Sequence, residues 1–155
     1  MNSRAFFLSL VCCCLVFSQV SCSRSKGKVI KDKVPLSQVT GTVIINSEPA
    51  QNVMIDCVPL TPIAEKRPQF GTSFRAVTAH DGTFSMSTYA RGDGIPYGQY
   101  AVLFRRLEQK PSGEKDLLGG QYSDVMKPFM KIKVEEGEEL DLGDIELKQP
   151  ANTEK

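Results

Sequence analysis

The sequence is poor in the residues that build catalytic and metal centres. Among its 155 residues there is one histidine, His80, and there is no tryptophan. A catalytic zinc ion takes about three protein ligands, usually with histidines among them. Neither a Gly-x-Ser-x-Gly elbow nor an Asp-x-Asp-x-Asp-Gly calcium loop occurs in the chain. We therefore expect a protein that is not an enzyme and that holds no metal and no cofactor.

Cysteine is scarce outside the first 22 residues. Of the five cysteines, Cys12 to Cys14 lie in an apolar stretch near the amino terminus and Cys22 follows it, which leaves Cys57 alone in the body of the chain. If Cys22 is modified, no disulfide within the chain can form. Cys57 alternates in phase with Val53 and Ile55, so the pattern predicts a buried and unreactive thiol.

Long hydrophobic runs are also missing. The longest, from Ala5 to Phe17, covers about 13 residues, and a helix needs about 20 to cross a bilayer. With Arg4 before it and small residues after it, the run has the layout of a signal peptide spanning residues 1–21. The sequence favours export.

The end of this leader resembles the bacterial lipobox, in which a cysteine is lipidated and becomes the new amino terminus. Val20 and Ser21 suit the positions before Cys22, and Gln19 stands where leucine is usual. The resemblance implies a lipid on Cys22 that holds the protein at the cell envelope, on the outer membrane or the periplasmic face. The alternative is cleavage by the ordinary signal peptidase, which would leave Cys22 as a plain thiol.

Charge of one sign is not in excess, because the formal net charge is +1. Between Ser23 and Lys33 the basic residues nevertheless outnumber the acidic ones by five to one, so the body beyond Lys33 is acidic in balance. Such a body does not attract a polyanion, and we expect no nucleic-acid partner. Residues 22–37 are predicted to form a lipidated cysteine followed by a flexible basic tether, and residues 149–155 a disordered tail.

What the chain does contain is a repeated alternation of apolar and polar residues, which is typical of half-buried strands. No segment has a convincing helical pattern. The predicted strands cover about seven segments: 39–46, 53–57, 70–78, 83–87, 99–107, 129–134 and 140–147. Together they predict an all-β protein, a β-sandwich of two stacked sheets.

Turn residues separate these strands. Ser47-Glu48-Pro49 predicts a first turn, and His80-Asp81-Gly82 predicts a hairpin because glycine accepts the positive φ that a tight turn needs. Residues 59–69 and 108–121 are expected to be loops. In the last strand the apolar phase changes, and a bulge at Gly143-Asp144 would reconcile its two halves.

Three segments resemble the carboxypeptidase regulatory-like domain: Val39-Thr40-Gly41-Thr42-Val43, Thr78-Ala79-His80-Asp81-Gly82-Thr83-Phe84 and Pro96-Tyr97-Gly98-Gln99-Tyr100-Ala101-Val102. Three others resemble small bacterial lipoproteins that carry this one domain: Thr88-Tyr89, Gly92-Asp93-Gly94-Ile95-Pro96 and Gln121-Tyr122-Ser123-Asp124. The resemblance covers most of residues 38–148. It implies a seven-stranded, Greek-key, transthyretin-like (prealbumin-type, Ig-like) sandwich and carries no implication of peptidase activity. Ala79 departs from the family, which often has aspartate there.

We therefore expect a non-catalytic exported lipoprotein that presents a β-sandwich as an interaction or structural domain. The partner would be an envelope protein or a glycan. One alternative is a carbohydrate- or peptide-binding module that uses the loops, with Tyr89, Asp93, Tyr97 and Tyr122 as candidate contact residues. Another is a protein that offers an edge strand to a partner.

Overall fold

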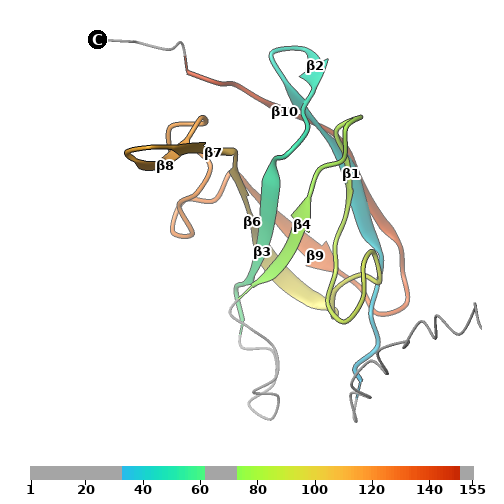
Figure 1. Ribbon diagram of the computed structural model, residues 1–155. Coiled ribbons are helices and arrows are strands. Elements are labelled where there is room, and N and C mark those ends of the chain that lie inside the picture. Colours follow the sequence, from blue (N-terminus) through green and yellow to red (C-terminus); the bar gives the residue numbers. More distant parts are fainter. Residues whose placement is uncertain (1–32, 62–72, 151–155) are drawn as a thin grey trace, which may run out of the picture. The chain divides into compact units, whose positions relative to one another are not determined.

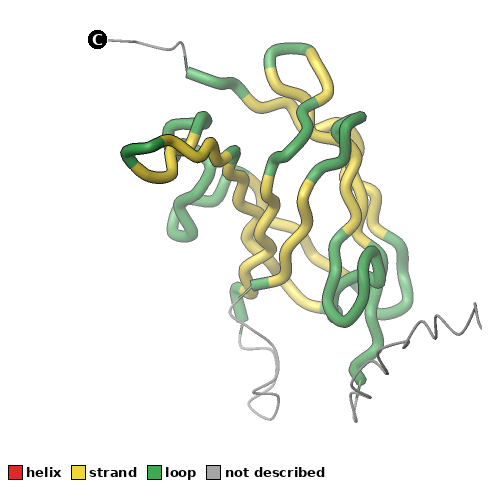
Figure 2. Tube along the Cα trace, in the orientation of Figure 1, coloured by secondary structure: helices red, strands yellow, loops and turns green. Residues whose placement is uncertain are grey.

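The computed structural model describes residues 33–61 and 73–150, and these form a sandwich of two β-sheets (Figures 1 and 2). In the first sheet β1 (Val39–Ile45) is central. It pairs in parallel with β10 (Leu140–Leu147) on one side. On its other side it pairs antiparallel with β5 (Thr83–Ser85) and β2 (Glu48–Pro49).

The second sheet is antiparallel throughout, in the order β4-β3-β6-β9. Its strands are β4 (Phe74–Val77), β3 (Met54–Pro59), β6 (Gly98–Arg105) and β9 (Met130–Val134). The described residues include no helix with the length and apolarity that crossing a membrane requires. The leader, the lipobox, the tether up to Asp32, residues 62–72 and the tail from Ala151 lie outside the described residues.

The core lies between the inward faces of the two sheets, as the alternation predicts. β1 buries every second residue, and in β6 Tyr100, Val102 and Phe104 are fully buried on one face. The Tyr100 ring meets Phe74 edge to face, with centroids 5.8 Å apart. The Tyr100 hydroxyl donates to the carbonyl of Pro96 at 2.7 Å, so the polar end of this buried ring is satisfied. The all-β sandwich expected from the sequence is confirmed.

The absence of a side chain at Gly41 makes room for an aromatic ring in this core. Gly41 lies opposite Phe84 across the β1–β5 pair. A Cβ built on Gly41 would come within 3.0 Å of the Phe84 ring, closer than carbon atoms pack. The missing side chain therefore lets the aromatic ring lie flat against the middle of β1.

The prediction of a hairpin at His80-Asp81-Gly82 is wrong in part. The turn itself forms, with Gly82 at φ +78° and the Ala79 amide donating to Thr83 O at 2.8 Å. The strands on either side, however, enter different sheets: β4 pairs with β3, and β5 pairs with β1. The sequence predicts the turn, but the chemistry of a turn does not specify which sheet each flanking strand joins.

Two further predictions need correction. The first turn lies at Asn46-Ser47, both with positive φ, which leaves Glu48 and Pro49 to form β2. The segment 108–121, expected to be a loop, contains a two-stranded hairpin of β7 (Leu107–Lys110) and β8 (Gly113–Asp116). Its side chains are mostly exposed and charged, so no apolar alternation marks it in the sequence. Residues 33–61 and 73–150 thus contain ten strands, where about seven were predicted for the chain.

The bulge in β10 is confirmed. Thr40 pairs with Asp141 but Thr42 pairs with Asp144, so β10 has one extra residue at this point, and Gly143 has φ +63°. The extra residue restores the inward phase, and Ile145 is buried beyond it.

Thr78, just after β4, is hydrogen-bonded to the segment that connects β2 to β3. Its buried hydroxyl donates to Ala50 O at 2.6 Å and accepts from the Val53 amide at 2.9 Å. Replacing it with valine keeps the shape but leaves both backbone groups without a partner. Buried groups in that state cost about 1–3 kcal/mol each.

We predict that Thr78→Val lowers the free energy of unfolding by about 3 kcal/mol. Thr78→Ser, which keeps the hydroxyl and loses one methyl, should lower it by about 1 kcal/mol. Urea unfolding of the two variants measures the difference between them. Equal losses would show that the hydroxyl does not hold this junction.

Candidate functional site

Cys57 and His80 are the side chains with the most obvious catalytic potential in the described part of the chain. The side chain of Cys57 is buried in the core, and this burial, with the neighbouring Asp56 charge, raises the pKa of its thiol to about 12. His80 lies exposed in the turn that follows β4. The described residues contain no cluster of histidine, cysteine, aspartate and glutamate that could hold a metal ion.

Asp93 organises its own loop. Its two carboxylate oxygens accept hydrogen bonds from the backbone amides of Thr88, Tyr89 and Ala90 at 2.8, 3.0 and 2.8 Å. Three donors leave this carboxylate little capacity for a ligand. The Arg91-Gly92-Asp93 triplet is therefore part of a folded loop whose aspartate faces its own backbone.

Tyr89 also has a structural role. Its hydroxyl accepts a hydrogen bond from the Val34 amide at 3.0 Å, and the Lys33 ammonium lies 5.4 Å from the ring centroid. These contacts connect the loop before β6 to the segment that leads into β1. Tyr97, in the same loop, is more than half exposed.

Tyr122 lies elsewhere. Its carbonyl accepts from the Phe104 amide at 2.9 Å, near the end of β6 that is remote from Tyr97. Its ring meets Phe129 edge to face at 5.2 Å, and its hydroxyl accepts from the Lys148 amide at 2.9 Å. The three tyrosines do not form one cluster, so they cannot stack on a single ligand.

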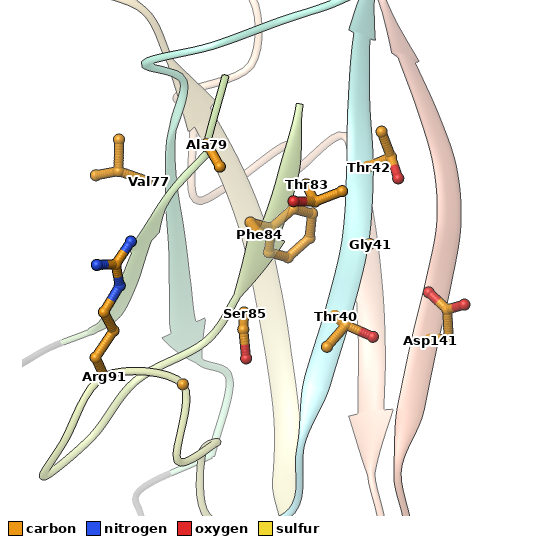
Figure 3. A pocket seen from close by; sticks show the side chains of 11 residues that line it. Thr40, Gly41, Thr42, Val77, Ala79, Thr83, Phe84, Ser85, Arg91 and Asp141 are labelled. Atoms are coloured by element: carbon orange, nitrogen blue, oxygen red, sulfur yellow. The ribbon is translucent and has the colours of Figure 1, made fainter. Parts of the chain in front are cut away.

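The structure offers instead a hollow over the outer face of the first sheet, bordered on one side by Val77 at the end of β4 and by Ala79 (Figure 3). Its volume is about 520 Å³, within the range of small-molecule sites. Strand register arranges its floor: Ser85 and Thr40 stand side by side on β5 and β1, with Asp141 beyond Thr40 on the edge strand β10. Thr83 and Thr42 form a second pair beside the first. We call these four hydroxyl residues, Thr40, Thr42, Thr83 and Ser85, the hydroxyl rows.

The rim of the hollow carries opposite charges. Arg91 stands on the loop after β5, and Asp141 stands on β10 across the sheet (Figure 3). The Asp141 Oδ1 accepts from the Gly143 amide at 3.0 Å, and the Thr83 hydroxyl donates to Asp81 at 2.7 Å. The hydroxyls of Thr40, Thr42 and Ser85 make no hydrogen bond to another described residue, so they are available to a ligand.

The sequence reasoning expected binding residues on loops and so missed this face. The signal was present: Thr40 and Thr42 are the outward members of the alternating β1 segment. What the sequence could not supply was the order of strands that places Ser85 and Asp141 on either side of Thr40.

No protein-family profile matches this chain, and no curated protein matches its sequence. Several solved structures, among them the following three, resemble it distantly. The major pilin subunit of Bacillus cereus is 16% identical, with a TM-score of 0.43 over 74% of this chain and 30% of the pilin. A DUF3823 family protein from Parabacteroides merdae is 13% identical, with a TM-score of 0.40 over 76% of this chain and 47% of that protein. A putative carbohydrate binding protein from Pseudomonas aeruginosa is 13% identical, with a TM-score of 0.40 over 76% of this chain and 91% of that protein.

This chain spans less than half the length of the first two of these proteins. At such identities the likeness concerns the fold only. The carboxypeptidase regulatory-like assignment stays a prediction from the sequence.

The reactivity of the Cys57 thiol tests directly whether this side chain is buried in the core. At pH 8 a thiol with a pKa of about 12 is almost entirely protonated, and the thiolate is the reactive form. We predict that iodoacetamide alkylates Cys57 at least about a hundredfold more slowly in the folded chain than in urea. Peptide mass spectrometry, which distinguishes Cys57 from the other cysteines, measures both rates. Comparable rates would show that this strand face is open to solvent.

Proposed function

We propose that the protein is a non-catalytic binding domain held at the outside of a bacterial membrane by a lipid on Cys22. The support for the anchor is the signal-peptide layout of residues 1–21 and the lipobox-like residues before Cys22. Residues 22–37 act as the tether, and their lysines add attraction to anionic headgroups. The sandwich is the part that meets other molecules.

A binding role fits the site better than catalysis does. The thiol of Cys57 is inaccessible, and His80 stands in an exposed turn with the Asp81 carboxylate already bonded to Thr83. General acid–base and nucleophilic catalysis both need a base within hydrogen-bond reach of the reacting group. The hydroxyl rows supply neutral hydrogen-bonding groups, which recognise a ligand without transforming it.

The hydroxyl rows are the observation that indicates which class of ligand this face binds. Hydroxyl groups both donate and accept hydrogen bonds. Neighbouring strands are roughly 4.8 Å apart and outward residues on one strand roughly 6.8 Å apart, so the rows form a lattice of polar groups. A glycan presents hydroxyls at comparable intervals, and Arg91 and Asp141 at the rim add charged partners. A glycan of the envelope is therefore the proposed ligand of this face.

The anchor is tested by metabolic labelling with palmitate in a bacterium that expresses the full chain. The wild type should be labelled and should sediment with membranes. Cys22→Ala should lose the label and the sedimentation, because the acylated thiol is gone. Cys57→Ala is the matched control and should keep both. Label retained in Cys22→Ala, or absent from the wild type, would contradict the anchor.

The ligand face is tested with a glycan array probed by the detergent-purified chain. We predict that the double variant Thr40→Val, Thr42→Val lowers affinity for the bound glycan about tenfold or more, since valine keeps the strand propensity but removes two hydrogen-bonding groups. Thr61→Val, an exposed threonine outside the hollow, is the matched control. A wild type that binds no glycan, or a double variant that binds as well as the wild type, would refute the assignment.

A further inference from the structure

A second hollow lies on the outer face of the other sheet, over β3, β4 and β6, and contains a charged cluster that the proposed function does not use. Its volume is about 530 Å³. At its base the side chain of Asp56 is only 5% exposed, although it points away from the core. Arg75 Nε donates to one oxygen of Asp56 at 2.7 Å, and Arg105 Nη2 donates to the other at 2.6 Å.

Strand register builds this cluster. Asp56 on β3 is directly opposite Arg75 on β4 and Leu103 on β6, and Arg105 follows two residues after Leu103 on the same face. Cross-strand neighbours at these positions are within reach of each other's side chains. The sheet therefore holds two guanidinium groups on either side of one carboxylate.

The cluster carries an unbalanced positive charge. A buried carboxylate needs a partner to offset its desolvation, and one arginine would neutralise it. Here there are two, so the group of three has a net charge of +1. No other acidic residue lines the hollow. Asp124, which lies between Ser123 and Val125 in the chain, accepts a hydrogen bond from the Met126 amide at 2.8 Å and does not line the hollow.

Both arginines also have N–H donors that Asp56 does not use. A guanidinium has five N–H groups in a planar fork, and Asp56 takes one nitrogen from each arginine. The remaining N–H groups have no partner among the described residues apart from a 3.7 Å contact of Arg105 with the Met54 sulfur. The two side chains are 52% and 37% exposed, so solvent and ligands reach them. Asp56 fixes their orientation, which lowers the entropy lost when they bind.

The other residues that line the hollow indicate which groups the ligand carries besides an anionic one. Val58, Leu103 and Val125 supply apolar surface next to the arginines, and Ser73 and Ser123 supply hydroxyls. A guanidinium fork matches the two oxygens of a carboxylate. A single excess positive charge matches a monoanion better than a phosphate dianion.

We propose that this hollow binds a carboxylate that carries a compact apolar group, the chemistry of an acylated aliphatic amino acid or a peptide carboxyl terminus. Arg75 and Arg105 hold the carboxylate, Asp56 positions them, and the apolar side chains receive the aliphatic group. The site is independent of the anchor at Cys22 and of the glycan face.

The experiment uses the full chain, purified from membranes in detergent, with N-acetyl-leucine as the probe. Calorimetry measures affinity, and the arginine Nε–Hε resonances report which side chains respond. N-acetyl-leucine should bind and shift the resonances of Arg75 and Arg105. N-acetyl-leucinamide, which has the same shape without the charge, should bind at least about tenfold more weakly. An acetylated tripeptide ending in leucine distinguishes a peptide terminus from a free small acid by its higher affinity.

Arg105→Gln should weaken binding of the acid about tenfold or more while leaving binding of the amide unchanged. Arg106→Gln, the next residue in the chain, does not line the hollow and serves as the matched control. Thermal unfolding of each variant shows whether it is folded, and the comparison of acid with amide on the wild type needs no variant.

The proposal fails if the acid and the amide bind the wild type equally, if neither binds, or if the two arginine resonances stay unchanged. Tighter binding of glucuronate or inorganic phosphate than of the aliphatic acid would contradict the proposed class of ligand.

Discussion

The register of the strands is the constraint on which the rest of this structure depends. Side chains alternate between the two faces of a strand, so a slip by one residue would exchange every core residue for an outward one. In β1 such a slip would expose Val39 and Val43 and bury Thr40 and Thr42. The apolar inner faces thus determine the pairing, and the pairing determines which polar groups meet on the outside.

Both proposed sites are consequences of this constraint. The hydroxyl rows exist because β5 and β1 align Ser85 with Thr40 and Thr83 with Thr42. The arginine pair exists because β4, β3 and β6 align Arg75, Asp56 and Leu103. The central residues of each site lie on paired strands, and loop residues such as Arg91 and Val125 complete the lining. The two sites differ in chemistry, because one presents neutral hydroxyls and the other a net positive charge.

The sequence predicts the fold well where burial determines the pattern. The alternation in 39–45, in 99–105 and in 130–134 is matched by strands, and the bulge beside Gly143 is found where the apolar phase changes. Prediction is weaker where burial is small. The β7–β8 hairpin has exposed charged side chains, and the turn at Gly82 gives no information on which sheet receives the next strand.

The candidate sites were less predictable for the same reason. Tyr89, Tyr97 and Tyr122 looked like ligand contacts because they lie in loops, but contacts far apart in the sequence assign Tyr89 and Tyr122 to structural roles. Asp56 is an outward residue of the alternating segment 53–57, and nothing in that segment marks it as part of a site. Its burial and its arginine partners depend on two strand pairings, one with β4, where Arg75 lies 19 residues away, and one with β6, where Arg105 lies 49 residues away. No local pattern encodes these pairings.

The most direct test of this account is a set of interstrand nuclear Overhauser effects measured on the folded chain. The account predicts contacts that place Thr40 between Ser85 and Asp141, Thr42 beside Asp144, and Asp56 between Arg75 and Leu103. A register displaced by one residue in either sheet would contradict it, since the polar rows and the arginine pair would then not exist on the outer faces.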